Sequence, residues 1–395
     1  MHPFLTSLVD RLATILKVDF RYLMSGGFFL GLTQVTSAIA ALGLTIAFAN
    51  LLPVETYGTY RYVLAVYALL AIAALPGLET SMMQSVARGF DSSLKRSVSI
   101  KLRWGLLGTL ASFSYAGYLY LQSSFIMGHI FMLVGVALPL MESFSMYSAF
   151  LNTKKMYRLS ATVDIIAQAA SIASLVCVML ITKNVIALML GYFAPYIIIR
   201  FIATKYVMHR YTTESTQDPG LLKYGRSMTL FQIVSRMIAS ADQIVLYHFL
   251  GPIQVAIFSL ATAIPNRAQA VFRITGTLAF PKVAVRTGKE VAESLPRKMV
   301  LFGFSILGIC AVYVLLAPLL FTFLFPQYLP SLVYSQAAIF FTLSSVTYPF
   351  GSYLMAHKKI RDTYIMAIGG FITKIVCLIG LVPFFGIWGA IVGIL

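Results

Sequence analysis

Long runs of apolar residues recur along the whole 395-residue chain and are separated by short polar segments. About 20 apolar residues in a helix cover the ~30 Å hydrocarbon core of a bilayer. Twelve such runs occur, at residues 23–50, 62–86, 102–121, 125–151, 160–182, 185–207, 224–250, 253–280, 299–325, 331–356, 363–383 and 386 onward. The pattern predicts an all-α polytopic membrane protein of about twelve transmembrane helices. The last run is short, so we expect the natural helix to continue past residue 395.

The segments between the runs alternate between basic and uncharged. Of the 30 Lys and Arg residues, 23 fall in six segments on one side of the predicted membrane, from Arg11 to Arg361. The opposite side has only Arg61 and Lys183. Because Lys and Arg are retained in cytoplasmic loops, we expect both termini to be cytoplasmic.

Composition supports the membrane assignment and excludes other classes. The chain is 59% hydrophobic and only 11% charged, whereas about a quarter of residues are charged in soluble proteins. The net charge of +17 is spread over six loops, so it does not indicate nucleic-acid binding. The three cysteines lie in apolar runs, which indicates neither a disulfide framework nor a metal site. No cofactor is expected.

The chain divides into two similar halves. A polar linker at residues 208–223 separates six runs from six, which predicts an N-terminal lobe at 1–207 and a C-terminal lobe at 224–395. A shift of 198 residues aligns the halves with faint similarity, as between Arg88 and Arg286. Two six-span halves have the same orientation, as in parallel repeats. Before the first run, a leucine stripe predicts an amphipathic helix on the cytoplasmic surface.

Prolines interrupt the even-numbered runs at Pro76, Pro139, Pro195, Pro265 and Pro349. Among the odd-numbered runs, Pro318 alone is comparable. A proline inside a helix removes one backbone hydrogen bond and bends the helix. These positions are either ordinary transmembrane prolines or bend points of a moving bundle.

Charged residues inside the apolar runs mark the candidate site, because a cation at the bilayer centre costs about 2.5–3.5 kcal/mol on insertion scales. The cations, which we take as candidate substrate-binding residues, are Arg200, Arg236, Arg267, Arg273 and Lys374. The acids, candidates for ion coupling or charge pairing, are Glu79, Glu142, Asp164 and Asp242. Alternatively, Arg200 and Arg273 snorkel to the interface, the first three acids pair with loop cations, and Asp242 pairs with Arg236 or Arg267.

Two polar stripes accompany these charges. One runs along 224–250 and comprises Gln232, Ser235, Arg236, Ser240, Asp242 and Gln243. The other comprises Asn266, Gln269 and Arg273, beside Arg267. Polar stripes in otherwise apolar helices predict a water-filled cavity, and the excess of cations predicts that its second-half wall is cationic. The short outer loops and the lack of a phosphate loop or metal-site motif argue against an enzyme, so we expect no catalytic residues.

The chain resembles the Wzx-type polysaccharide flippases, which belong to the multidrug/oligosaccharidyl-lipid/polysaccharide (MOP) superfamily. The resemblance rests on Leu-Leu-Pro-Val-Glu-Thr-Tyr-Gly-Thr-Tyr at 51–60, Ala-Arg-Gly at 87–89 and Ala-Asp-Gln-Ile-Val-Leu-Tyr-His-Phe-Leu-Gly-Pro at 241–252. It implies a V-shaped pair of six-helix lobes in the bacterial inner membrane. The implied substrate is an undecaprenyl-diphosphate-linked oligosaccharide, such as an O-antigen unit in lipopolysaccharide biosynthesis, moved to the periplasmic leaflet. Other membrane proteins of polysaccharide assembly are the implied partners.

Three alternatives remain open. A MATE-type multidrug antiporter of the same superfamily generally suits cationic drugs, which a cationic cavity repels. A lipid II flippase usually carries two additional helices. A membrane scaffold or channel needs neither the prolines nor the charge asymmetry between the halves.

Overall fold

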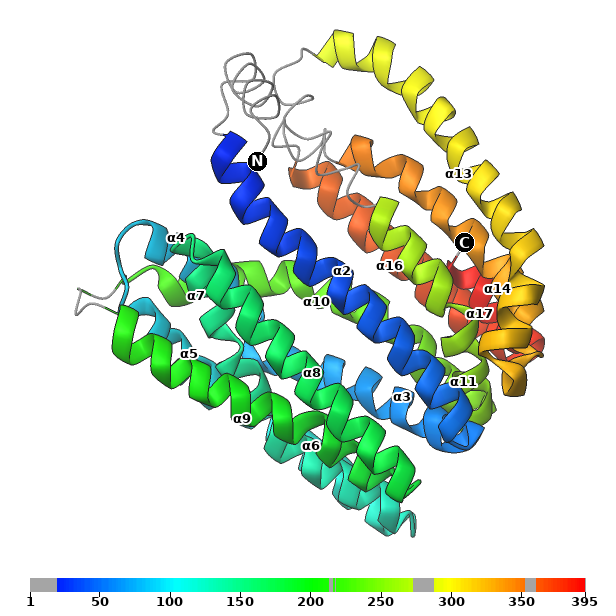
Figure 1. The fold of residues 1–395 in the computed structure, drawn as a ribbon, viewed down its shortest axis with the longest axis horizontal. Helices are drawn as coiled ribbons and strands as arrows, with labels where there is room; N and C mark the ends of the chain where they lie inside the picture. Colours follow the sequence, from blue (N-terminus) through cyan, green and yellow to red (C-terminus); the bar gives the residue numbers. More distant parts are fainter. Residues whose placement is uncertain (1–19, 213–215, 217, 273–287, 352–359, 395) are drawn as a thin grey trace, which may run out of the picture. The chain divides into compact units, whose positions relative to one another are not determined.

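A computed structural model describes residues 20–212, 216, 218–272, 288–351 and 360–394, and these are helical apart from short connections (Figure 1). The N-terminal amphipathic segment and Arg273 lie outside the described residues. The helices are α2 (Phe20–Leu51), α3 (Val54–Leu70), α4 (Leu78–Ala87), α5 (Ser93–Leu121), α6 (Phe125–Phe144), α7 (Met146–Thr153), α8 (Tyr157–Ile181), α9 (Val185–Tyr211), α10 (Leu221–Leu250), α11 (Pro252–Ala261), α13 (Gly288–Leu324), α14 (Ser331–Ala338), α16 (Ile360–Phe385) and α17 (Ile387–Ile394). Three 3₁₀ helices join them, η1 (Ala71–Ala74), η2 (Pro326–Tyr328) and η3 (Ile339–Thr347).

The protein is a multi-pass membrane protein. Within the described part of the chain, six helical segments are long and apolar enough to cross a bilayer: Val54–Ala74, Phe125–Thr153, Tyr157–Ile181, Val185–Tyr211, Met299–Leu324 and Ile368–Phe385. The prediction of an all-helical membrane fold is therefore confirmed. Each of the predicted runs contains helical residues, although several are divided into two shorter segments.

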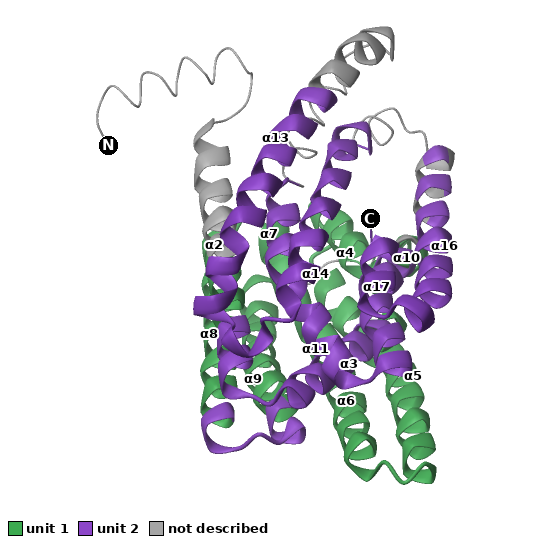
Figure 2. Ribbon diagram, turned by 90° about the vertical axis from the view of Figure 1, so that its right-hand side faces the viewer, with its two compact units in different colours: residues 1–43, 70–178, 189–230 green, residues 44–69, 179–188, 231–395 purple. Residues whose placement is uncertain are grey.

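The chain forms two compact units, coloured separately in Figure 2. Unit 1 comprises the described residues of Met1–Gly43, Leu70–Val178 and Met189–Leu230. Unit 2 comprises Leu44–Leu69, Met179–Leu188 and the described residues of Phe231–Leu395. Several helices, α10 among them, begin in one unit and end in the other. The lobe boundaries predicted at the 208–223 linker stay a prediction.

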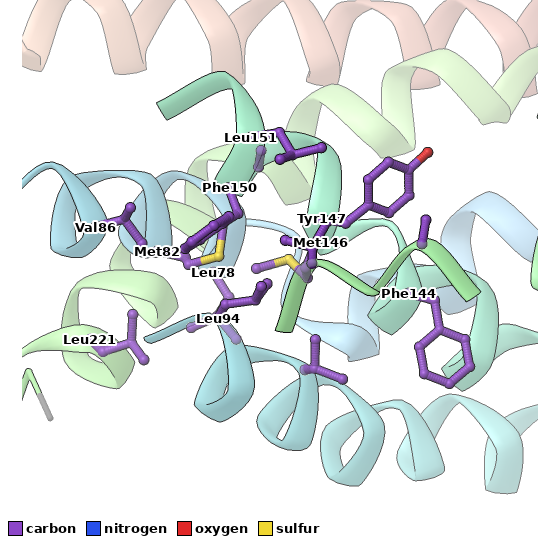
Figure 3. Packing of buried hydrophobic residues seen from close by; sticks show 14 of the residues in the cluster. Leu78, Met82, Val86, Leu94, Phe144, Met146, Tyr147, Phe150, Leu151 and Leu221 are labelled. Carbon is purple, nitrogen blue, oxygen red and sulfur yellow. The ribbon is translucent and has the colours of Figure 1, made fainter. Parts of the chain in front are cut away.

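The core of unit 1 is a cluster of buried apolar side chains from α4, α5, α7 and the start of α10. Figure 3 shows Leu78, Met82, Phe150 and Leu221 among them, converging from these helices. Leu221, the first residue of α10, is completely buried there. Van der Waals packing of these side chains holds the start of α10 against α4.

Prolines coincide with breaks in most of the even-numbered runs. The second run changes to η1, passes Leu75 in a left-handed conformation (φ 54°) and resumes as α4 after Pro76. The eighth run breaks at Thr262, three residues before Pro265, and the tenth contains η3 just before Pro349. α9, by contrast, continues through Pro195. A break three to four residues before a proline follows from the hydrogen bond that the proline cannot make.

Two of the carbonyls released by prolines accept hydrogen bonds from side chains of neighbouring helices. The carbonyl of Gly135, four residues before Pro139, accepts from Thr109 Oγ1 at 2.7 Å. The carbonyl of Val314, four residues before Pro318, accepts from Gln336 Nε2 at 3.0 Å. Such side-chain donors are how a bilayer-embedded helix tolerates proline.

Close backbone packing joins α4 to α10 inside unit 1. The backbone N–H of Gly77 donates to Thr229 Oγ1 at 3.1 Å. A Cβ atom at Gly77 would lie 2.2 Å from the Thr229 backbone nitrogen. The φ of Gly77 is −66°, which any residue can adopt. Glycine is therefore required by the close contact and not by the backbone conformation.

We expect Gly77→Ala to lower the thermal unfolding midpoint of the detergent-solubilised protein, because overpacking typically costs about 1–3 kcal/mol. Gly117→Ala on α5 is the matched control, since no atom lies within 4 Å of a Cβ there. That control should unfold at the same temperature or slightly higher, because alanine is the better helix former by ~1 kcal/mol. Equal midpoints for the two variants would contradict the close contact.

The end of the 208–223 linker, which is itself part of unit 1, is held against α4 and α5 through Asp218. Asp218 is buried, and its carboxylate accepts from Ser85 Oγ at 2.5 Å and from the Gly220 N–H at 2.8 Å. Arg96 Nη1 donates to the Asp218 carbonyl at 3.1 Å. The hydrogen bond from Ser85, followed by that from Gly220, lowers the pKa of the Asp218 carboxyl below its usual value. The linker is thus attached to α4 and α5 immediately before α10 begins.

A carboxyl whose pKa is lower in the folded than in the unfolded state stabilises the fold above its unfolded pKa of ~3.9. That contribution is lost as the pH falls through the folded-state pKa. Asp218→Asn should therefore destabilise the protein at pH 7, and the difference from wild type should shrink below about pH 4. Ser92→Ala, which removes a hydrogen bond to the Thr216 carbonyl without removing a charge, should show a difference that does not vary with pH. Unfolding midpoints measured across this pH range test both expectations.

Candidate functional site

A polar cavity of about 730 Å³ lies inside unit 2. Its walls come from α3, α10, α11, the helical residues 263–272, η3, α16 and α17. The lining residues are Arg61, Ser235, Ile238, Ala239, Asp242, Gln243, Phe258, Thr262, Asn266, Gln269, Phe341, Ser344, Tyr348, Lys374 and Ile394. The volume is in the range of ~300–1,000 Å³ typical of ligand pockets.

An ion pair occupies one wall of this cavity. Lys374 Nζ, on α16, lies 2.7 Å from Asp242 Oδ2, on α10. The same ammonium donates to the carbonyl of Ile238, one turn before Asp242, at 2.9 Å. Asp242 Oδ1 is buried and makes no hydrogen bond within the described part of the chain. Within the described residues, the pair therefore leaves one buried carboxylate oxygen without a hydrogen bond.

Arg61 supplies a second cation from α3. When the Gln243 amide is turned over so that its oxygen faces the guanidinium, that oxygen accepts from Arg61 Nη2 at 2.7 Å and the amide NH₂ donates to the Arg61 carbonyl at 3.0 Å. This two-point contact fixes the guanidinium against α10 without neutralising it. The Nε of Arg61 is buried and has no hydrogen-bond partner among the described residues. Arg61 is thus a positioned charge with remaining donor capacity.

Neutral polar groups and aromatic rings complete the lining. Gln269 Nε2 donates to Ser344 Oγ at 3.2 Å, which joins the helical residues 263–272 to η3. Asn266 and Ser235 add further donors and acceptors, and Phe341 and Tyr348 add ring surface. Amides, hydroxyls and aromatic rings are groups that fix the orientation of a bound ligand.

Among the described residues, one of the cations predicted to bind substrate lines the cavity and others lie elsewhere. Lys374 lines the cavity, whereas Arg236 and Arg267 are not among its lining residues. Arg236 is half-buried on α10, and Arg267 is exposed. Arg200 belongs to unit 1, where its guanidinium lies 4.7 Å from the centre of the Tyr196 ring. The ion pair of Asp242 is made with Lys374, and neither arginine considered from the sequence takes that place.

The remaining predicted acids belong to unit 1 and not to the cavity. Asp164 accepts hydrogen bonds from Tyr147 Oη at 2.6 Å and from Ser148 Oγ at 3.0 Å. Lys101 donates to the Glu142 carbonyl at 3.1 Å and lies 3.7 Å from its carboxylate. Glu79 is exposed. Glu142 thus lies beside a cation, but Lys101 is a buried residue of α5 and not a loop cation.

Arg61 is the cavity residue that the hydrophobic pattern assigned to an outer loop. Its helix begins at Val54, eight residues before the predicted run, so Arg61 lies two turns inside the helix. Pro53 and Glu55 indicate this earlier helix start in the sequence, because proline near the first turn and an acidic residue within it are typical of a helix start.

The arrangement offers positive charge to an anion and hydrogen-bonding amides to a polyol. The lining contains two cations, Arg61 and Lys374, and one carboxylate, Asp242, so it carries a formal charge of +1. A guanidinium offers two parallel N–H donors to a phosphate, and an ammonium acts as a point charge. The amides of Asn266 and Gln269 are suited to sugar hydroxyls.

Comparison with known proteins gives the same picture of the fold. The family model described as polysaccharide biosynthesis protein matches residues 23–281. The chain is similar to the lipid II flippase MurJ in an inward closed conformation, with a TM-score of 0.67 and 15% identity over 93% of this chain and 84% of that one. It is similar to a multidrug resistance MATE family transporter of the MOP superfamily in its inward-facing conformation, with a TM-score of 0.66 and 12% identity over 91% and 90%. Its outward-facing conformation gives 0.64 and 13% over 93% and 90%.

No curated protein sequence matches the chain. The family match nevertheless covers well over half of the 395 residues, and the structural similarity extends over nearly all of them. The fold is that of the MOP-superfamily transporters, and the chain belongs to the polysaccharide biosynthesis protein family.

Proposed function

We propose that the protein is a flippase that moves an undecaprenyl-diphosphate-linked oligosaccharide, such as an O-antigen unit, from the cytoplasmic to the periplasmic leaflet of the bacterial inner membrane. The proposal includes twelve membrane spans with both termini in the cytoplasm. Family membership gives the biosynthetic context. The observation that carries the substrate class is the polar cavity with two cations, one carboxylate and several amides.

Arg61 is the proposed anchor of the diphosphate. Gln243 fixes its guanidinium, and the remaining N–H groups match the oxygens of a phosphate. Lys374 adds a second positive charge in the same cavity. Asn266, Gln269 and Ser235 would then meet the sugars. Arg236, Arg267, Arg273 and Arg200 remain proposed substrate-binding residues.

Only the head group would enter the cavity. A polyprenyl chain some tens of carbons long gains about 0.8 kcal/mol for each CH₂ kept in the bilayer. The lipid tail would therefore stay in the membrane while the head group crosses. The proposed mechanism is alternating access, in which the lobes at 1–207 and 224–395 rock about the 208–223 linker and the proline-bent helices flex.

The proposed topology predicts which positions a membrane-impermeant thiol reagent reaches in intact cells. In a background without native cysteines, Thr153→Cys and Thr216→Cys should be protected, because both lie in basic segments. Ser123→Cys and Gln254→Cys should react, because Ser123 lies in a short uncharged segment and Gln254 at the start of the run that follows another such segment. Labelling of Thr216→Cys from outside would overturn the orientation.

Transport by the purified protein in vesicles tests the function itself. Vesicles containing a fluorescent undecaprenyl-diphosphate-linked oligosaccharide should show its movement between leaflets only when the protein is present. Movement of lipid II in preference to other glycans would instead favour a lipid II flippase. Uptake of cationic drugs without glycolipid movement would favour a MATE-type antiporter, and an ion current would favour a channel.

A further inference from the structure

The segment η3 (Ile339–Thr347) is a 3₁₀ helix of nine residues inside the tenth apolar run. It continues directly from α14, and residues 348–351 after it are α-helical again. Stretches of 3₁₀ helix longer than three or four residues are uncommon, because their hydrogen-bond geometry is poorer than that of an α-helix. A 3₁₀ stretch in the middle of a helix often marks a hinge.

The sequence of η3 explains why its backbone departs from the α-helix. Three of its hydroxyl groups donate to the carbonyl three residues earlier, at 2.6, 2.7 and 2.7 Å: Thr342, Ser344 and Thr347. Such bonds offer the backbone an alternative to the α-helical pattern. Pro349 acts in the same direction, because it has no N–H for the Ser345 carbonyl four residues earlier. That carbonyl accepts from the N–H of Tyr348, three residues on.

The helix before η3 is held in place. On α13, Tyr313 Oη lies 2.7 Å from Ser335 Oγ of α14. Gln336 Nε2 of α14 donates to the Val314 carbonyl of α13 at 3.0 Å. A change of helix type in η3 would therefore move the residues that follow α14 and leave α14 itself against α13.

The residues that would move include part of the cavity lining. Phe341, Ser344 and Tyr348 all line the cavity. Ser344 Oγ also accepts from Gln269 Nε2 at 3.2 Å. The helix type of η3 thus decides which side chains this wall presents to a ligand.

Standard helix geometry gives the size of the movement. A 3₁₀ helix rises about 2.0 Å and turns about 120° per residue, whereas an α-helix rises about 1.5 Å and turns about 100°. Conversion of the nine residues of η3 to an α-helix would shorten the segment by about 4–5 Å and rotate its far end by about half a turn. Ser344 would rotate by about 120° relative to α14, which takes its hydroxyl away from Gln269.

We propose that η3 changes between the 3₁₀ form and an α-helical form, and that this change places Ser344 and Tyr348 in the cavity or withdraws them. A ligand that bonds to Ser344 holds the 3₁₀ form, and its release permits the α-helical form. The inference goes beyond the proposed function, because it does not depend on which ligand the cavity takes.

The distance between two spin labels across η3 tests the proposal. Val333→Cys and Phe350→Cys place the labels at exposed positions on either side of the segment. Cys177→Ser and Cys377→Ser remove other thiols, whereas Cys310 is kept because it is completely buried and lies against η3. Pulsed electron paramagnetic resonance on the detergent-solubilised protein, without any ligand, gives the distribution of label separations.

Two variants should favour the α-helical form. Pro349→Ala supplies an N–H for the Ser345 carbonyl, and Thr347→Ala removes an exposed hydroxyl that bonds back within η3. Each should raise the fraction of molecules whose label separation is about 4–5 Å shorter than the main separation in wild type. Thr347→Ala decides the matter if Pro349→Ala does not fold. Pro330→Ala, which precedes α14 and the labelled pair, should leave the distribution unchanged.

A second pair of variants tests the link between η3 and the cavity. Gln269→Ala removes the hydrogen bond to Ser344 and should also raise the fraction with the shorter separation. Asn266→Ala is the matched control, because Asn266 lines the same cavity and its side chain makes no hydrogen bond to η3 within the described residues. This control should give the wild-type distribution.

The possible failures are distinguishable. Distributions in Pro349→Ala and Thr347→Ala that coincide with wild type would overturn the two forms of η3. A shorter separation that becomes more frequent in these variants but not in Gln269→Ala would overturn the link to the cavity. Because the measurement uses no ligand, neither failure bears on the substrate of the proposed function, and a failure of glycolipid transport leaves the label separations unaffected.

Discussion

Replacing Arg61 with alanine is expected to abolish glycolipid transport while leaving the amount of protein in the membrane unchanged. The guanidinium is fixed by Gln243 and retains a buried Nε–H without a partner in the described residues. A hydrogen bond to a charged group contributes about 1.5–3 kcal/mol. The loss of two such bonds to a diphosphate would reduce affinity by well over about a hundredfold.

Conservative and control variants sharpen the expectation for Arg61. Arg61→Lys should recover part of the activity, because an ammonium still attracts phosphate but lacks the paired donors. Lys183→Ala removes the other cation predicted outside the basic loops, on the exposed connection between α8 and α9, and should transport like wild type. The readouts are glycolipid transport in vesicles that contain the protein and the amount of protein in the membrane, measured by immunoblot. Full activity of Arg61→Ala would remove Arg61 from the binding site.

The second large effect is expected at Lys374. Lys374→Met leaves Asp242 buried without its ion-pair partner, and breaking a buried pair in this way typically costs about 3–5 kcal/mol. The variant should be less stable and inactive. The double variant Lys374→Met/Asp242→Asn removes both charges and should recover most of the stability, because no unpaired charge remains.

Transport by the double variant distinguishes binding from structure. If Lys374 holds the ligand, the stable double variant stays inactive. If Lys374 serves only to neutralise Asp242, the double variant transports normally, and the substrate-binding role of Lys374 is wrong. Thermal unfolding and vesicle transport measured on the same preparations give both answers. The matched comparison is Lys101→Met, which breaks the ion pair with Glu142 in unit 1 and should affect stability without a specific loss of diphosphate binding.

The sequence predicted the two polar helices of the site because a helical stripe is a local property. Ser235, Asp242 and Gln243 line the cavity from α10, and Asn266 and Gln269 line it from the following helix. Side chains three, four or seven residues apart share a helix face whatever the tertiary structure. The side chains that a helix presents to a cavity can therefore be predicted before the cavity itself is known.

The ion-pair partner of Asp242 could not be predicted in the same way. Arg236 and Arg267 are nearer in the sequence, yet Lys374 of α16 makes the contact. Which cation reaches a carboxylate depends on how distant helices pack. The spacing of residues along one sequence does not reveal that packing. Arg61 and Lys101 illustrate a second limit. Both were assigned to loops because charge lowered the local hydropathy, although both lie inside helices, α3 and α5.

The most direct test of the central claim is the fate of the lipid-linked glycan in cells that lack this protein. Mass spectrometry should identify an undecaprenyl-diphosphate-linked oligosaccharide that accumulates, and its accessibility to an impermeant sugar-modifying enzyme should place it on the cytoplasmic leaflet. Expression of the wild-type chain should move it to the periplasmic leaflet, and expression of Arg61→Ala should not. Glycolipid that reaches the periplasmic leaflet at a normal rate without the protein would contradict the proposed function.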